Sequence, residues 1–261
     1  MIPSTAMKWW MCFGLSVLCI APAVCVAVPP AAVKAVVKTA VLRGGKLVVQ
    51  EGDSVLFTID DVVRASGTVL REALDGVTDI SVFAKIAKSR FPAVVSDRSV
   101  YRLTMVADDL AKVPGAEDVM RLLLANNHAN VKGALGELEL AAFLVRRKNI
   151  VVTGMREIVE TGLGKTDIDI AFTYRGKPVH LERKAIDALA LTDDLRIKID
   201  KMAELAGSRG TVPILAAGEI PPSGSLLDYA ASKGVTVTYG GYLNQCRMVQ
   251  EALEGSMALV Q

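Results

Sequence analysis

The chain has 261 residues, of which 51% are hydrophobic and 22% are charged, and its formal net charge is +2. This length suffices for one large core or two small ones. The small net charge excludes a broad basic surface, so any contact with a polyanion has to come from a local site. Three of the four cysteines lie within one apolar run near the N-terminus, which excludes a disulfide framework and a zinc cluster.

Residues 1–28 have the pattern of a targeting segment. Residues 9–28 carry no charge, Lys8 precedes them and Pro29 follows them. This run predicts either a cleaved signal peptide or a retained membrane anchor, since about 20 apolar residues span a bilayer. The basic residues just after the run favour the cytoplasmic side, whereas small residues at 25–27 suit cleavage and export. We expect a membrane-targeted protein, and both the exported (periplasmic) form and the inner-membrane-anchored form stay open.

Residues 29–130 are predicted to form a small α+β region of unknown role. Apolar runs at 46–49 and 54–59 flank a turn and predict a β-hairpin. We expect a helix over 60–76, a strand over 99–107 and a helix over 116–127. No chemical motif is present in this region.

Residues 131–241 have the alternating pattern of an α/β domain, and residues 242–261 form a C-terminal helix or tail. The expected order is helix, three strands, helix, strand, helix and strand, at 132–149, 150–158, the two strands within 164–185, 192–207, 211–218, 225–234 and 235–240. Thr192 is expected to cap the second helix and Gly207 to end it. Leu195, Ile199, Met202 and Ala206 form its predicted buried stripe. Apolar strands alternating with helices imply a sheet that is covered on both faces.

Charged residues interrupt the two strands within 164–185. Because side chains alternate along a strand, Asp167 and Asp169 share one face, while Ile168, Ile170 and Phe172 point into the core. His180, Glu182 and Lys184 share a face of the next strand, opposite Val179 and Leu181. If the two strands pair so that these side chains point to the same face of the sheet, the carboxylates and the lysine converge. Adjacent carboxylates repel and need a cation, and their oxygens suit Mg²⁺ or Mn²⁺. The lysine would position or deprotonate a water molecule.

The helix over 132–149 contributes a further carboxylate. On a helical wheel Glu137 lies on the buried flank, while Glu139 lies beside Arg146 on the solvent side. A buried carboxylate is costly without a partner, and a metal site would supply one.

The set Gly136-Glu137, Asp169 and Glu182-x-Lys184, on this order of elements, resembles the PD-(D/E)xK nuclease superfamily, which includes Holliday junction resolvases and Mrr-like enzymes. The resemblance covers about Lys132 to Gly240, and Ile168 stands where the family's proline precedes the aspartate. It implies a restriction-endonuclease-like mixed sheet flanked by helices, with an α-β-β-β-α-β core.

The resemblance also implies an endonuclease that hydrolyses phosphodiester bonds with Mg²⁺ or Mn²⁺. Asp169 and Glu182 would hold the metal, Glu137 would complete the site, and Lys184 would orient the attacking water. DNA is the expected partner in preference to RNA, and many relatives act as homodimers. Asp167 and His180 are candidates for supporting roles beside the metal ligands. Arg183 is interpreted as solvated. For Arg196 and Lys198, at the start of the following helix, a solvated helix face is preferred over a contact with phosphate.

Two other interpretations belong to different classes of function. A non-catalytic protein of the same fold, a binding protein or a scaffold at the membrane, would use Asp169, Glu182 and Lys184 as an internal ion-pair network. The stretch Gly162–Thr166 resembles a phosphate-binding loop only superficially, because it lacks the first glycine and leads into a strand.

Overall fold

The computed structural model describes the backbone of residues 39–43, 46–51 and 54–58, the single residues Leu70, Leu74 and Val77, and residues 79–186 and 188–258. The predicted targeting segment lies outside the described residues. None of the helices that the structure describes is long and apolar enough to cross a membrane.

The first described element is a small antiparallel sheet in the order β1-β2-β3, formed by β1 (Thr39–Arg43), β2 (Lys46–Glu51) and β3 (Ser54–Thr58). The β2–β3 pair closes at Glu51↔Ser54 and confirms the predicted hairpin. Most of the predicted helix over 60–76 lies outside the described residues, although the N–H of Leu74 donates to the carbonyl of Leu70 at 2.9 Å, as in a helical turn.

A helical layer follows this sheet within the predicted α+β region. It consists of α3 (Ile80–Arg90), α4 (Asp97–Thr104), α5 (Ala107–Leu110) and α6 (Ala116–Leu122). The expected strand over 99–107 is wrong, because that range contains most of α4. Ser96 caps α4 by accepting the N–H of Ser99, and Ser99 and Leu103 are both buried one turn apart. A tertiary contact face at helical spacing therefore overrides the strand propensity of Val100 and Tyr101.

The second half contains a five-stranded mixed sheet in the order β4-β5-β6-β7-β8. Its elements are α7 (His128–Val145), β4 (Ile150–Thr161), β5 (Gly164–Tyr174), β6 (Lys177–Arg183), α8 (Asp193–Arg209), β7 (Val212–Ala216), α9 (Gly224–Ser232), β8 (Thr236–Thr238) and α10 (Tyr242–Ala258). The first three strands pair antiparallel and the last three pair parallel. This order confirms the predicted sequence of elements, with α10 in the range expected for a C-terminal helix.

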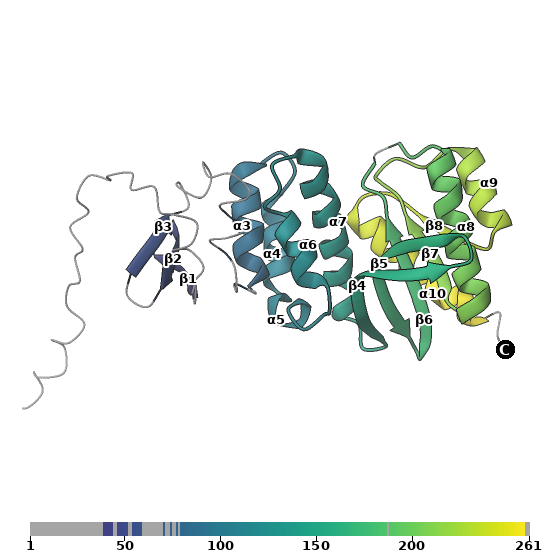
Figure 1. Cartoon of the computed structure of the whole chain (residues 1–261), viewed down its shortest axis with the longest axis horizontal. Coiled ribbons are helices and arrows are strands. Elements are labelled where there is room, and N and C mark those ends of the chain that lie inside the picture. The colour runs from purple at the N-terminus through teal and green to yellow at the C-terminus, as the bar shows by residue number, and fades with distance from the viewer. Residues whose placement is uncertain are drawn as a thin grey trace, which may run out of the picture.

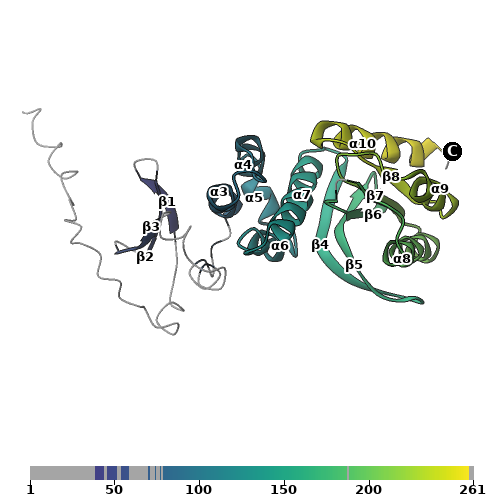
Figure 2. The same cartoon turned by 90° about the horizontal axis from the view of Figure 1, so that it is seen from above.

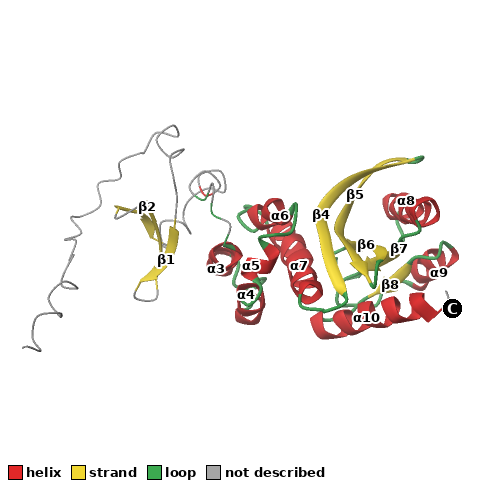
Figure 3. Cartoon of the chain, turned by 90° about the horizontal axis from the view of Figure 1, so that it is seen from below, coloured by secondary structure: helices red, strands yellow, loops and turns green. Residues whose placement is uncertain are grey.

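Helices cover both faces of this sheet, as predicted. Helices α7 and α10 lie on one face and α8 and α9 on the other (Figures 2 and 3). Figure 1 shows α3 and α4 on the far side of α7 from the sheet, whereas α6 contacts β4 as well as α7. One buried cluster runs from Leu70 through α7 and the sheet to Leu253, so the boundary proposed at residue 130 does not separate two hydrophobic cores.

Several details in this half differ from the sequence prediction. Helix α7 starts at His128, since Asn127 accepts the N–H of Asn130 as its cap. Thr192 caps α8 as expected, but the helix continues past Gly207 to Gly210, which has the left-handed φ of 63° that a C-cap favours. In its buried stripe Leu205 takes the place expected for Ala206.

The turns of the β4–β5–β6 meander are tight. Arg175 and Gly176 have φ values of 50° and 82°, so both central residues of the β5–β6 turn are left-handed, which matches a right-handed strand twist. The β4–β5 turn at Gly162 and Leu163 joins two strands, and its N–H groups donate to Glu204 of α8. This stretch is therefore a hairpin tip rather than a phosphate-binding loop.

Candidate functional site

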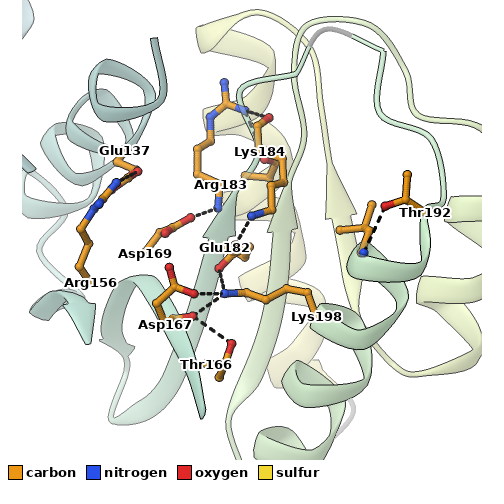
Figure 4. Close-up of polar contacts among 12 residues, drawn as sticks. Glu137, Arg156, Thr166, Asp167, Asp169, Glu182, Arg183, Lys184, Thr192 and Lys198 are labelled. Carbon is orange, nitrogen blue, oxygen red and sulfur yellow. Dashed lines mark hydrogen bonds and ion pairs between the residues drawn. The ribbon is translucent and has the colours of Figure 1, made fainter. Parts of the chain in front are cut away.

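The centre of the candidate site is the point where β5 and β6 part. Their last paired residues are Ile170 and Leu181, so Asp169 and Glu182 occupy the next position of the same register. The side chain of Asp169 continues the ladder in place of the backbone, since its Oδ2 accepts the N–H of Arg183 at 2.6 Å. This hydrogen bond leaves Oδ1 of Asp169 for another partner, and it fixes the carboxylate beside Glu182 (Figure 4).

Lys184 closes on the same spot from the end of β6. Its Nζ lies 2.7 Å from Oε1 of Glu182, and its backbone N–H donates to the carbonyl of Ala216 on β7 at 2.8 Å. The side chain of Glu182 is 3% exposed and that of Lys184 is 36% exposed. The lysine therefore reaches from solvent onto a buried carboxylate. The structure brings together the three residues that the strand pattern predicted to converge.

The opposite faces of these strands are apolar, with one departure from the expected alternation. Val179, Leu181, Ile170 and Phe172 enter the main core, as the pattern predicts. Ile168 instead packs in a small cluster with Val159, Ala171 and Leu205, on the α8 side. The strand pair has opened at this position, so the side chains before Asp169 no longer follow the alternation of the paired segment.

Glu137 lies on the buried flank of α7, as the helical wheel predicts, and is 4% exposed. Its partner is Arg156 of β4. The guanidinium Nε donates to Oε2 at 3.1 Å and Nη2 donates to Oε1 at 2.8 Å, in a bidentate pair (Figure 4). Glu139 does not face open solvent, because Arg102 of α4 lies 2.8 Å from it. The sequence could not show α4 packing across this side of α7.

Lys198 of α8 is the second cation on Glu182, and its expected solvated position is wrong. Its Nζ lies 2.8 Å from Oε2 of Glu182 and 2.7 Å from Oδ1 of Asp167, and its side chain is only 13% exposed. The signal in the sequence is its spacing, three residues after Leu195 and four before Met202, which places it on the buried face of the helix. Asp167 is half exposed and touches the centre of the site through this lysine.

Arg183 is also not solvated. Its Nη1 donates to the carbonyls of Lys184 at 2.6 Å, Ala217 at 2.7 Å and Ala216 at 3.2 Å, so it ties the end of β6 to the end of β7. Gly136 of α7 leaves room for it, since a Cβ there would lie 3.0 Å from the guanidinium Nε. Arg196, in contrast, projects over the Tyr229 ring at 4.9 Å on the outer side of α8.

His180 lies beside Glu182 on the α8 side, and its Nδ1 is buried without a hydrogen-bond partner. Burial lowers the pKa of His180 to about 4, with a smaller contribution from the charge of Arg209. The imidazole is therefore neutral at physiological pH, as suits a partly buried flank of the site.

Burial and mutual repulsion dominate the electrostatics of the carboxylates. Burial raises the pKa of Glu182 to about 7, and the charge of Asp169 adds to the effect. Burial and the charge of Glu137 raise the pKa of Asp169 to about 6. Burial also raises the pKa of Glu137, against the opposing hydrogen bond from Arg156. Burial lowers the pKa of Lys184, but the charge and hydrogen bond of Glu182 and the charges of Asp169 and Asp167 together outweigh burial and raise the pKa above the ordinary value, so the side chain is an ammonium.

Cations of the protein itself pair with two of the buried carboxylates: Arg156 with Glu137, and Lys184 and Lys198 with Glu182. Within the described part of the chain, no three His, Cys, Asp or Glu side chains stand together as a ready metal cluster. A cleft of about 700 Å³ adjoins the site across Arg183, and His128, Lys132 and Ala185 contribute to its lining. Glu137, Asp169 and Glu182 are not among the residues that line this cleft. Asp167 and Glu182 border a hollow of about 10 Å³ against α8.

Comparison with known proteins finds no family for this chain and only solved structures of low similarity. No protein-family model and no curated protein matches the chain. Among solved structures, SfsA of Pyrococcus furiosus in complex with Ca²⁺ is 13% identical with a TM-score of 0.31, over 41% of this chain and 54% of that one. Can2 of Sulfobacillus thermosulfidooxidans in complex with cyclic tetra-adenylate is 10% identical with a TM-score of 0.39, over 80% and 67%. Protein VC1899 of Vibrio cholerae is 14% identical with a TM-score of 0.38, over 75% and 57%. The chain thus spans about half to two thirds of these proteins.

Proposed function

We propose that this protein is a metal-dependent endonuclease that hydrolyses phosphodiester bonds of DNA, with RNA the less favoured substrate. The observation that carries the proposal is the meeting of Asp169, Glu182 and Lys184 where β5 and β6 separate, with Glu137 approaching from α7. Two carboxylates that face each other at the open end of a strand pair, with a lysine on one of them, form the constellation that the sequence resemblance implies.

The residues present fit Mg²⁺ or Mn²⁺. Asp169 and Glu182 are buried carboxylates with raised pKa values, and hard divalent cations prefer such oxygens. Both oxygens of Glu182 have an ammonium within 2.8 Å but no well-directed hydrogen bond, so a cation can replace these contacts without loss of a directed bond. Asp169 and Glu182 would hold the ion. Glu137 would join them only if its pair with Arg156 opened.

A bound divalent ion would stabilise the negative charge that develops on the phosphate in the transition state. The chain's own residues do the positioning. Arg183 fixes Asp169 through its backbone N–H, and Lys198 holds Glu182 against α8. Lys184 is charged, so it donates a hydrogen bond to the attacking water or to the phosphate and does not act as the general base.

The test is incubation of the purified protein with supercoiled plasmid, linear duplex and RNA, with Mg²⁺, Mn²⁺ or a chelator. We expect metal-dependent cleavage of DNA that is lost in Asp169→Asn, Glu182→Gln and Lys184→Met. Glu157→Gln is the matched control, because Glu157 is an exposed carboxylate on β4, paired with Ile168 next to the site. Equal loss in the control, or no cleavage of any substrate by the wild-type protein, would contradict the proposal.

A second candidate function is that of a non-catalytic binding or scaffold protein. The observation in its favour is that Arg156, Lys184 and Lys198 already neutralise Glu137 and Glu182 without any metal. The two candidates differ in thermal stability with Mn²⁺. If the site binds metal, Mn²⁺ raises the melting temperature, because a ligand that binds the folded state stabilises it. Glu182→Gln then abolishes this increase. An ion-pair network predicts no change.

Membrane targeting by residues 1–28 and a homodimer are parts of the same proposal. Fractionation of cells that express a tagged full-length chain tests the first, and the mass of the mature N-terminus distinguishes a cleaved signal from a retained anchor. Sedimentation of the purified protein tests the second.

A further inference from the structure

Arg156 lies beside the candidate site, and the proposed chemistry does not explain its backbone conformation. Its φ of 52° lies in the left-handed region, and among the described non-glycine residues only Arg175 shares a positive φ. Arg175 needs this conformation for the β5–β6 turn. Arg156 lies within a strand, where no turn requires this conformation, and such strained backbone conformations concentrate at functional sites. The strain directs the side chain of Arg156 toward Glu137.

The contact that results is asymmetric. The side chain of Glu137 is 5% exposed, whereas that of Arg156 is 38% exposed. The carboxylate is thus fixed in the protein interior and the guanidinium approaches it from the solvent side. An arginine in this position can leave without unpacking the core. The charges of Asp169 and Asp167 act on Arg156 together with that of Glu137, so the guanidinium faces the whole acidic group and not one partner alone.

A guanidinium fork matches a carboxylate and a phosphate equally well, since both present two oxygens in one plane. If Glu137 became a ligand of a divalent ion, Arg156 would lose its partner, and a phosphodiester bound beside it would offer a new one. We propose that Arg156 is a phosphate-binding catalytic residue: it pairs with Glu137 in the metal-free protein, and it contacts a non-bridging oxygen of the scissile phosphate once a divalent ion has taken Glu137 as a ligand. This inference rests on the proposed nuclease function.

Two measurements on Arg156→Met test this role, because they are expected to change in opposite directions. Without substrate, Mn²⁺ affinity measured by calorimetry should rise about tenfold, since Glu137 no longer has a competing cation. With plasmid at saturating Mn²⁺, kcat should fall about 100-fold or more, the usual effect of losing one donor to transition-state charge. A purely structural counter-ion predicts tighter Mn²⁺ binding with undiminished cleavage, and that result would overturn the inference while leaving the nuclease proposal intact.

Arg102→Met is the matched control. Arg102 of α4 pairs with Glu139, which lies on α7 like Glu137. The distance of 2.8 Å equals that between Arg156 and Glu137. Mn²⁺ affinity and kcat should both stay within about twofold of the wild-type values, as expected for a pair remote from the reacting phosphate. An equal loss of cleavage in this control would show a general effect of breaking an Arg–Glu pair on α7, and would overturn the specific role of Arg156.

A double variant covers the case in which Arg156→Met leaves Glu137 unpaired and the protein unfolds. Glu137→Gln/Arg156→Met removes both charges, and it is compared with Glu137→Gln at saturating Mn²⁺. If Arg156 binds phosphate, the double variant cleaves at least tenfold more slowly than the single variant. Equal rates would overturn the inference, because neutralising Glu137 would then be the whole function of Arg156. Absence of cleavage by the wild-type protein would refute the nuclease function and this inference together.

Discussion

Replacement of Lys198 by methionine tests whether the network at the site is as buried as its geometry indicates. The side chain of Glu182 is 3% exposed and that of Lys198 is 13% exposed, with 2.8 Å between Oε2 and Nζ. Breaking a buried pair by removing one partner costs about 3–5 kcal/mol. Lys184 remains on the other oxygen, so we expect a loss near the lower end, about 3 kcal/mol, in metal-free protein at alkaline pH.

The pH dependence of this loss identifies its cause. In the wild-type protein the folded pKa of Glu182 is about 7, above the ordinary 4.5, so the folded state binds this proton more tightly than the unfolded state. The contribution of Glu182 to stability therefore falls as pH rises toward 7 and then levels off. Without the Lys198 ammonium, the folded pKa rises further. The variant then continues to lose about 1.4 kcal/mol per pH unit above pH 7, where the wild-type protein has levelled off.

The assay is urea unfolding followed by circular dichroism in the presence of a chelator, at several pH values between about 5 and 9. The difference between wild type and Lys198→Met should be smallest below pH 6, where Glu182 is protonated in both, and should grow above pH 7. Lys201→Met is the control, because Lys201 lies on the same helix and donates to the carbonyl of Lys165 near solvent. A difference that is independent of pH, or no greater than that of the control, would refute the reasoning.

Three further outcomes follow from the same geometry. Asp169→Asn should stabilise the metal-free protein by about 1–3 kcal/mol at pH 8 and much less at pH 5, because it removes a carboxylate whose pKa is raised to about 6. Urea unfolding measures this difference, and a loss of stability would favour the ion-pair network. Glu137→Gln should weaken Mn²⁺ binding about tenfold by calorimetry while Glu139→Gln leaves it unchanged, and equal losses would contradict the assignment of Glu137 to the site. Thr192→Ala should lower the free energy of unfolding by about 1 kcal/mol, since the Thr192 hydroxyl caps α8, and should leave Mn²⁺ affinity unchanged.

The sequence alone predicted the order of elements from α7 to α10 and the central group of the site. Hydrophobic periodicity and alternation are local properties, and they are strong in α7, β5 and α8. The convergence of Asp169, Glu182 and Lys184 also follows locally, because β5 and β6 are joined by a two-residue turn that fixes their register. The burial of Glu137 follows from its phase on one helix. Each of these needs only contacts between near neighbours in the chain.

Tertiary structure decided which partners these residues have. Arg156 reaches Glu137 from a strained position in β4, and no local pattern predicts a left-handed arginine within a strand. Arg183 reaches β7 only because α8 connects β6 to β7 and lets the two strands pair in parallel. Lys198 becomes buried when α8 packs on the open end of β5, and Glu139 meets Arg102 when α4 packs on α7. The strand propensity of 99–107 likewise yields to the helical packing of α4. The interior of a protein permits few unpaired charges, so the identity of each partner is fixed by packing between distant segments.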